Sequence, residues 1–267
     1  MLKRICKKIL TLYATQRLRV LSKSEGVTAI TARSIHKALT ESAPYTCGIE
    51  LIRRSLLKDK TEVAITEHGA GSKLINAAPN KNRMVCDIVR ASISPLKGRI
   101  LYNLVRGFNP TSCLELGTSI GISTAYIATA LEINNTLGRI RTIEGSEELS
   151  ALAEKYINQL GFQRRCTFLT GTFNKLIPAS PLLDFVFIDG DHTEQATIYH
   201  YQNILPYLAD RAVVVFDDIR WSSGMVSAWE RITNHAAVKT VFDLRIMGVC
   251  IIDRLASGKR VYRIPIY

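Results

Sequence analysis

Short apolar runs alternate with amphipathic stretches through the second half of the chain. The apolar runs lie at 112–116, 140–144, 166–170, 183–189 and 212–217, and helical spacing of apolar residues follows at 123–131, 147–160, 174–177 and 195–208. A further helix at 224–235 precedes two apolar runs at 238–244 and 249–253. Strands that are apolar throughout are typical of a parallel sheet covered by helices on both faces. We therefore predict an α/β fold whose sheet ends in an antiparallel pair.

The first part of the chain is predicted to be helical. Helices are expected at 2–21, 29–40, 48–57, 84–93 and 96–107, with a glycine-broken loop at 68–73. In the first helix Leu2, Ile5, Ile9 and Tyr13 share one face, and lysines and arginines fill the other. We expect the apolar face to pack on the rest of the protein. The predicted organisation is a basic helical extension or lid over residues 1–83 and an α/β domain over residues 84–267.

Positive charge is concentrated in this extension. The chain has a formal net charge of +12, and residues 1–60 contain thirteen Lys and Arg against four Asp and Glu. Hydrophobic residues make up 47% of the chain and charged residues 22%, as is usual for globular proteins in water. No apolar run approaches the ~20 residues of a membrane span. The six cysteines are scattered without metal-type spacing, so we expect a reducing, cytoplasmic environment.

A glycine-containing turn follows the first predicted strand. The segment reads Cys-Leu-Glu-Leu-Gly-Thr-Ser-Ile-Gly-Ile-Ser-Thr over residues 113–124. Gly117 and Gly121 would let the backbone turn sharply close to a ligand. The next strand ends in Glu144, whose carboxylate could accept hydrogen bonds from both hydroxyls of a ribose. A nicotinamide-binding turn, G-x-G-x-x-G, would need glycine at position 119 and a small residue at 122, where this chain has Ser119 and Ile122.

This segment resembles the first motif of the class I S-adenosylmethionine-dependent methyltransferases, which has the form E-x-G-T-x-x-G-x-S-T. The resemblance implies a Rossmann-like fold with a mostly parallel sheet of seven strands, and S-adenosyl-L-methionine as the cofactor. O-methyltransferases commonly have Gly-Asp beside the adenine after the third strand, whereas this chain has Gly-Thr there, which leaves backbone groups for that contact. The cofactor-binding residues that the resemblance implies are Glu115, Gly117, Thr118, Ser119, Gly121, Ser123, Glu144, Gly145, Gly171, Thr172 and Asp189.

Acidic residues follow the fourth and fifth predicted strands. The fourth strand ends at Asp189 and the fifth is followed by Asp217 and Asp218. The carboxyl ends of parallel strands lie at one edge of a sheet, where ligands bind. Three carboxylates that converge there would repel one another unless a cation or a proton lay between them. Oxygen ligands of this kind suit Mg²⁺, Mn²⁺ or Ca²⁺.

The arrangement also resembles the metal-dependent catechol and caffeoyl-coenzyme A O-methyltransferases, whose motif has an Asp after strand four and Asp-Asn after strand five. Asp189 and Asp217 match that motif, and Asp218 replaces the Asn. The family places a lysine base three residues after the first Asp, where this chain has His192. The resemblance implies that Asp189, Asp217 and Asp218 bind a divalent ion. It also implies that Asp189 and His192 act on a small hydroxylated acceptor, since histidine can take a proton near neutral pH.

Several alternatives stay open. Asp191 and Thr193 could cap the next helix, His192 could be a surface histidine, and the site could be free of metal, with Asp217 only structural. Trp221 and Met225 could line an apolar acceptor pocket. The basic extension suggests an RNA-modifying methyltransferase or a membrane-surface or partner-binding protein. The motifs favour a small-molecule acceptor, and they leave a homodimer open.

Overall fold

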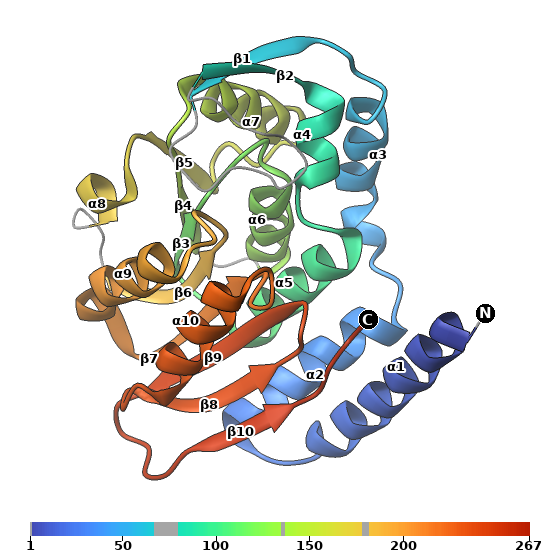
Figure 1. Cartoon of the computed structure of the whole chain (residues 1–267), viewed down its shortest axis with the longest axis vertical. Coiled ribbons are helices and arrows are strands. Elements are labelled where there is room, and N and C mark those ends of the chain that lie inside the picture. Colours follow the sequence, from blue (N-terminus) through green and yellow to red (C-terminus); the bar gives the residue numbers. More distant parts are fainter. Residues whose placement is uncertain (1, 67–79, 135–136, 178–181) are drawn as a thin grey trace.

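The computed structural model describes residues 2–66, 80–134, 137–177 and 182–267. Its centre is an eight-stranded sheet in the order β10-β8-β9-β7-β6-β3-β4-β5 (Figure 1). The strands are β3 (Ser112–Leu116), β4 (Arg139–Glu144), β5 (Cys166–Thr170), β6 (Leu183–Ile188), β7 (Leu208–Asp217), β8 (Val238–Asp243), β9 (Met247–Asp253) and β10 (Arg260–Arg263). Only β9 runs antiparallel to its neighbours, β7 and β8, and the other pairs in the sheet are parallel. The predicted α/β class and the closing antiparallel pair are confirmed.

The sheet has one strand more than the predicted seven. β10 pairs in parallel with β8, where Val261 lies beside Val241. This strand was not predicted because it has only four residues, begins and ends with arginine, and is mostly exposed at the sheet edge. A short, charged edge strand of this kind discourages pairing with other chains.

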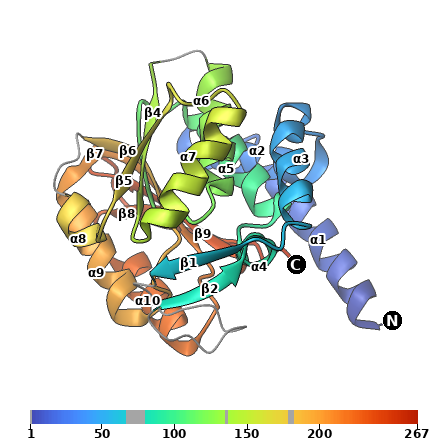
Figure 2. The same ribbon diagram turned by 90° about the horizontal axis from the view of Figure 1, so that it is seen from above.

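Successive side chains of each strand point to opposite faces of the sheet, which divides the core into two layers. In β6, Phe185 and Phe187 pack on one side of the sheet, and Val186 and Ile188 pack on the other. This is the period of two that a strand imposes on its side chains. The first layer includes α5 (Pro95–Phe108), α6 (Ile122–Asn134) and α7 (Glu147–Gln159), and the second includes α8 (Phe173–Leu176), α9 (Glu194–Ile204) and α10 (Ser223–Asn234). Figure 2 shows these helices on either side of the strands.

The N-terminal segment contains α1 (Leu2–Leu21), α2 (Gly26–Thr40), α3 (Cys47–Leu56) and α4 (Val85–Ala91). An antiparallel hairpin of β1 (Glu62–Thr66) and β2 (Asn80–Met84) was not predicted, because polar residues dominate β2 and obscure the strand pattern. The predicted loop at 68–73 lies outside the described residues. None of the described helices is long and apolar enough to cross a bilayer.

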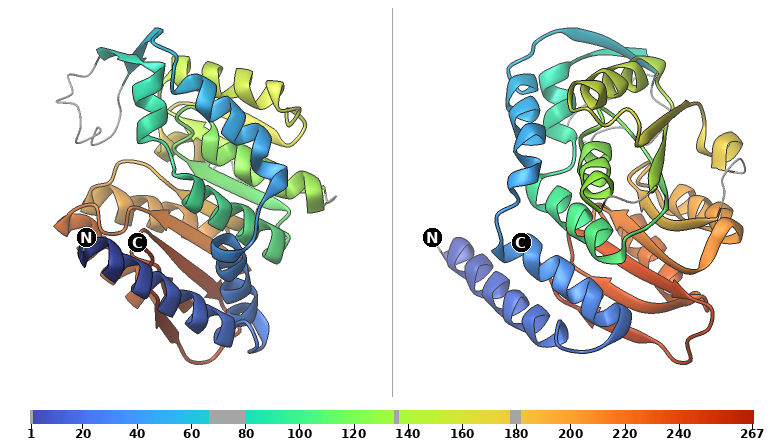
Figure 3. Two further views of the ribbon diagram at one scale, coloured as in Figure 1. Left: turned by 90° about the vertical axis from the view of Figure 1, so that its right-hand side faces the viewer. Right: turned by 180° about the vertical axis from the view of Figure 1, so that it is seen from behind.

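The packing of α1 differs from the prediction. α1 lies along α2 at the periphery (Figure 3), and over residues 9–21 its buried residues are Ala14 and Leu18. Ile9, Leu12 and Tyr13, by contrast, are exposed. Over residues 9–21, α1 therefore packs through a different face from the expected apolar one.

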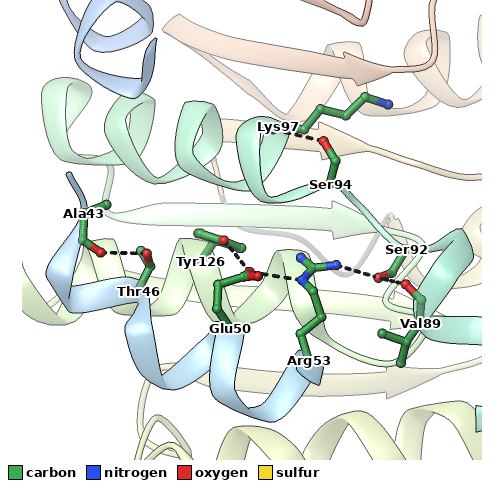
Figure 4. A network of polar contacts seen from close by, with 9 residues as sticks. All are labelled: Ala43, Thr46, Glu50, Arg53, Val89, Ser92, Ser94, Lys97 and Tyr126. Atoms are coloured by element: carbon green, nitrogen blue, oxygen red, sulfur yellow. Dashed lines mark hydrogen bonds and ion pairs between the residues drawn. The ribbon is translucent and has the colours of Figure 1, made fainter. Parts of the chain in front are cut away.

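Polar contacts attach α3 to the helices that cover the sheet. Glu50 accepts hydrogen bonds from Tyr126 Oη at 2.7 Å and from Arg53 Nε at 3.0 Å, and Arg53 also donates to Ser92 (Figure 4). Close by, α5 lies directly on the Tyr126 ring, since a Cβ at Gly98 would come within 2.3 Å of it. These contacts fix the start of α5, and Lys97 lies in its first turn.

Candidate active site

The turn after β3 requires glycine for two reasons. Gly117 has a φ of +98°, and a Cβ there would lie 2.2 Å from the backbone oxygen of Asp189. Gly121 has a φ of +80°, and its Cβ would lie 3.0 Å from that of Ala153. Both positions combine a left-handed backbone with a close approach, which side chains do not tolerate. Gly117 therefore lets the turn after β3 touch the end of β6.

Three polar residues of the motif face inward and support the turn. Glu115 is fully buried and accepts hydrogen bonds from the hydroxyls of Thr124 and Thr142. Thr118 is also buried, and its hydroxyl lies 2.5 Å from that of Thr142. Burial raises the pKa of Glu115 to about 7, and a hydrogen bond from Ser123 partly opposes that effect. The side chains of Glu115, Thr118 and Ser123 thus hold the turn in place, and any ligand contact from Thr118 falls to its backbone.

Glu144 ends β4 and faces the same turn. Its carboxylate accepts hydrogen bonds from the backbone N–H of Ser119 at 2.7 Å and of Ser146 at 3.0 Å. Ser119 has a φ of +48°, which aims its N–H at this carboxylate. Glu144 is only half-buried, so its carboxylate is partly accessible at the ligand-binding edge of the sheet.

The next strand contributes backbone groups at this edge. The N–H of Gly171 donates to the carbonyl oxygen of Glu144 at 2.8 Å, and Gly145 is partly exposed. Thr172 is exposed at the start of α8, and its side chain does not cap that helix. The predicted cofactor residues of β3, β4 and β5 therefore meet at adjacent strand ends.

The acidic residues after β6 and β7 also meet, and a lysine lies among them. Asp189 follows β6 and Asp217 ends β7, two adjacent strands in which Ile188 pairs with Phe216. The Nζ of Lys97 lies 2.7 Å from Oδ1 of Asp217 and 2.6 Å from Oδ1 of Asp218. Lys97 comes from α5, far earlier in the chain, and it was not among the predicted site residues.

The charges of this cluster are strongly coupled. Burial opposes the charge on Lys97, but the carboxylates of Asp217 and Asp218 outweigh it and raise the pKa of Lys97 to about 12. Burial and the charge of Asp189 raise the pKa of Asp217 well above its ordinary value, and Lys97 opposes only part of that rise. The ammonium of Lys97 is thus the positive charge that stabilises two neighbouring carboxylates.

The expected divalent ion does not fit this geometry. Asp217 and Asp218 hold Lys97 Nζ at the position from which an ion would contact both, and Mg²⁺ requires oxygens at about 2.0–2.1 Å in the same place. Within the described parts of the chain, no group of three or more His, Cys, Asp and Glu side chains is arranged to hold a metal. The positive charge beside two of the three carboxylates, those of Asp217 and Asp218, is that of a side chain.

His192 lies beside Asp189, as the spacing predicted. Its Nε2 is 3.4 Å from Oδ1 of Asp189, and its ring centre is 6.1 Å from that of Trp221. Burial lowers the pKa of His192, but the neighbouring carboxylates, above all Asp189, outweigh it and leave the pKa above its ordinary value. Met225 is buried and accepts a hydrogen bond from Thr197, so it belongs to the core.

The backbone around these groups is strained. Ser119, Asp191, His192 and Asp218 all have positive φ values, of 48°, 62°, 25° and 47°. Residues other than glycine rarely adopt this region, and such strain gathers at functional sites. All four residues lie in turns that follow strands at the same edge of the sheet.

A second histidine fixes the loop between Asp189 and α9. His200 Nε2 lies 2.7 Å from Oδ2 of Asp191, and the His200 ring meets the ring of Phe173 edge-on with centres 5.0 Å apart. Thr193 alone provides the side-chain cap of α9. Asp191 therefore does not cap the helix as predicted, and its partner could not be predicted because it lies two helical turns into α9.

Comparisons with known proteins agree with this arrangement. Residues 114–219 match a family of methyltransferase domains. The catechol O-methyltransferase of Niastella koreensis is 35% identical over 106 residues, which are 38% of this chain and 46% of that protein. The transmembrane O-methyltransferase of Propithecus coquereli is 39% identical over 87 residues, which are 32% of this chain and 31% of that protein. The chain thus spans less than half the length of these two relatives.

A solved structure extends the likeness over most of the fold. It is an O-methyltransferase from Bacillus cereus in complex with SAH, with a TM-score of 0.58 and 18% identity, and the match covers 85% of this chain and 100% of that one. At this identity the likeness concerns the fold alone.

Proposed function

We propose that this chain, a class I S-adenosylmethionine-dependent methyltransferase by its fold and its matched domain, transfers the methyl group to an oxygen of a small hydroxylated acceptor. The observation that carries the proposal is the juxtaposition of two groups at one sheet edge. The turn at Gly117 and Gly121 faces Glu144, and the pair of Asp189 and His192 lies beside that turn. The O-methyltransferases among the relatives support the choice of oxygen.

The first group would bind the cofactor. The glycine turn would hold the methionine part, Glu144 would accept hydrogen bonds from the ribose hydroxyls, and backbone groups at Gly171 and Thr172 would contact the adenine. The two backbone N–H groups that donate to Glu144 hold its carboxylate beside the glycine turn. When bound, the cofactor supplies the electrophilic methyl group.

The second group would act on the acceptor. The acceptor hydroxyl must lose a proton as its oxygen attacks the methyl carbon in line with the departing sulfur. His192 would take that proton, and Asp189 would orient the imidazole and stabilise its charged form. The divalent ion expected from sequence is not part of this proposal, because Lys97 fills its place. Nothing in the described residues or in the comparisons favours the RNA-modifying alternative.

The test is transfer of a labelled methyl group from S-adenosylmethionine to a panel of catechols and other hydroxylated small molecules. We expect labelled ether products with at least one acceptor, together with saturable binding of S-adenosylhomocysteine in calorimetry. Protein that is folded and binds neither S-adenosylmethionine nor S-adenosylhomocysteine would contradict the proposal. Transfer to nitrogen or carbon acceptors alone would keep the cofactor and overturn the choice of oxygen.

A further inference from the structure

The contact between Lys97 and two aspartates joins the start of α5 to the candidate acceptor site. The side chain of Lys97 is 14% exposed, that of Asp217 5% and that of Asp218 31%. Lys97 is thus mostly enclosed, and it reaches two consecutive carboxylates at the end of β7. Surface ion pairs of lysine seldom have fixed geometry, but this one is held by burial and by two acids at once.

The start of α5 is built so that Lys97 points there. Ser94 caps the helix by accepting a hydrogen bond from the backbone N–H of Lys97, and Pro95 occupies the first turn. The next residue is Gly98, which has no side chain and so lets α5 lie on the ring of Tyr126. Figure 4 shows the Lys97 side chain extending away from this cap. The helix start is therefore fixed on both sides of the lysine.

Ammonium and a divalent ion exclude each other at this position. Nζ lies within 2.7 Å of one oxygen of each aspartate, and an ion that contacted the same oxygens would overlap it. For an ion to bind, Lys97 would have to leave a buried position and abandon both partners. Moving the ammonium out of this buried contact is costly, and that cost would reduce the binding free energy of the ion.

We propose that Lys97 is the built-in cation of the acceptor site and takes the place of the divalent ion used by metal-dependent O-methyltransferases. The inference rests on the proposed function for the identity of the acceptor, but the exclusion of metal does not depend on it. An ammonium group has three N–H donors; that of Lys97 donates to Oδ1 of Asp218 and forms an ion pair with Asp217, which together occupy at most two of them among the described residues. The third is available to an acceptor oxygen, and a hydrogen bond from it stabilises negative charge that develops there.

The same arrangement suits the cofactor. The positive charge of Lys97 balances one of the three carboxylate charges and leaves the cluster negatively charged. A negative cluster would favour binding of the positively charged sulfonium at this sheet edge. In the reaction the acceptor oxygen forms a bond to the methyl carbon, the bond from that carbon to sulfur breaks with its electron pair on sulfur, and the hydroxyl proton goes to His192. Lys97 remains protonated throughout.

The direct experiment measures metal binding, with Mn²⁺ as the probe and electron paramagnetic resonance as the readout. Wild-type protein, with S-adenosylhomocysteine present or absent, is expected to leave Mn²⁺ free. Lys97→Ala opens the two carboxylates and is expected to bind Mn²⁺ at least about tenfold more tightly than wild type. The double variant Lys97→Ala with Asp217→Asn should lose that gain. Lys37→Ala is the matched control, because Lys37 is exposed on α2.

Measurements of turnover then distinguish two roles for Lys97. It either supplies positive charge to the acceptor or only attaches α5 to the sheet. Wild-type methyl transfer is expected to be unchanged by EDTA. Lys97→Ala should lose turnover, and millimolar Mg²⁺ should restore part of it, which would not happen if Lys97 were only a tether. Stoichiometric Mn²⁺ binding by the wild type that disappears in Asp217→Asn would overturn the inference. So would a folded Lys97→Ala protein with full turnover in EDTA, or with lost turnover that Mg²⁺ does not restore.

Discussion

The two halves of the candidate site differ in how the chain assembles them. The cofactor half comes from turns after three consecutive strands, β3, β4 and β5, and its parts lie in one continuous stretch of the chain. The acceptor half comes from the ends of β6 and β7 but is complete only with Lys97. This lysine belongs to α5, which precedes all strands of the large sheet in sequence. A motif can describe the first half, whereas the second depends on tertiary packing. Mutations should therefore separate the two halves.

The largest effect is expected where the halves touch. Gly117→Ala would place a Cβ 2.2 Å from the backbone oxygen of Asp189, at a φ of +98°. Neither backbone can move without disturbing both halves, so we expect a loss of at least about 4 kcal/mol in the free energy of unfolding. Urea denaturation measures it.

Gly161→Ala is the control for Gly117→Ala. Gly161 has a similar φ of +81° with nothing within 4 Å of a new Cβ. It should cost only about 1–2 kcal/mol, the strain of the backbone alone. Equal losses for the two variants would show that Gly117 does not join the halves.

The next effect should be confined to the acceptor half. His192→Ala removes the proposed proton acceptor and should lower the turnover rate about 10²–10⁴-fold, the usual range for a general base. Affinity for S-adenosylhomocysteine in calorimetry should stay within about twofold of wild type. His36→Ala, on α2, serves as the control. A similar fall in cofactor affinity and in rate would mean that the two halves are not separable.

The converse effect should be confined to the cofactor half. Glu144→Ala removes a charged acceptor of two ribose hydrogen bonds and should weaken binding of S-adenosylhomocysteine by roughly 2–4 kcal/mol. Glu144 also receives the backbone N–H of Ser119 and Ser146, so circular dichroism must confirm that the variant is folded. Glu147→Ala, exposed in the next turn, should bind normally. Unchanged affinity in folded Glu144→Ala would refute the ribose assignment.

The smallest effect concerns the support beneath the cofactor turn. Burial raises the pKa of Glu115 from 4.5 to about 7, so the folded state holds its proton more tightly than the unfolded state. The stability that this proton confers is complete below pH 4.5 and is lost as the pH rises through 7. The resulting loss in the free energy of unfolding between pH 6 and 8 is roughly 1–1.5 kcal/mol.

Glu115→Gln should remove that part of the pH dependence. Urea denaturation of the variant and of the wild type at several pH values would give the difference. Parallel curves for the two proteins would show that Glu115 does not titrate in this range.

Much of the cofactor half could be predicted from sequence because its determinants are local. The apolar strands, the glycines of the turn and Glu144 all follow from spacing, and the structure places them as neighbours. The roles within the motif were harder to predict. Whether Thr118 faces a ligand or the hydroxyl of Thr142 depends on the side-chain packing beneath the turn.

The acceptor half could be predicted only in part. Sequence spacing placed Asp189, His192, Asp217 and Asp218 at one sheet edge and indicated that a cation or a proton lies among the acids. It could not indicate Lys97, because α5 and β7 come together only in the folded protein. The Ser-Pro pair at 94–95 predicts a helix start but gives no sign of what Lys97 contacts.

The positive φ angles at Ser119, Asp191, His192 and Asp218 have a consequence for engineering this protein. Each such residue costs of order 1–3 kcal/mol relative to a residue that suits the conformation. A directed-evolution screen that rewards heat resistance alone would therefore favour glycine or asparagine at these four positions, and so would consensus-style stabilisation. Two of these residues, His192 and Asp218, carry side chains of the acceptor half. Thermostable variants from such a screen would keep the fold and lose the chemistry, so these positions should be held fixed.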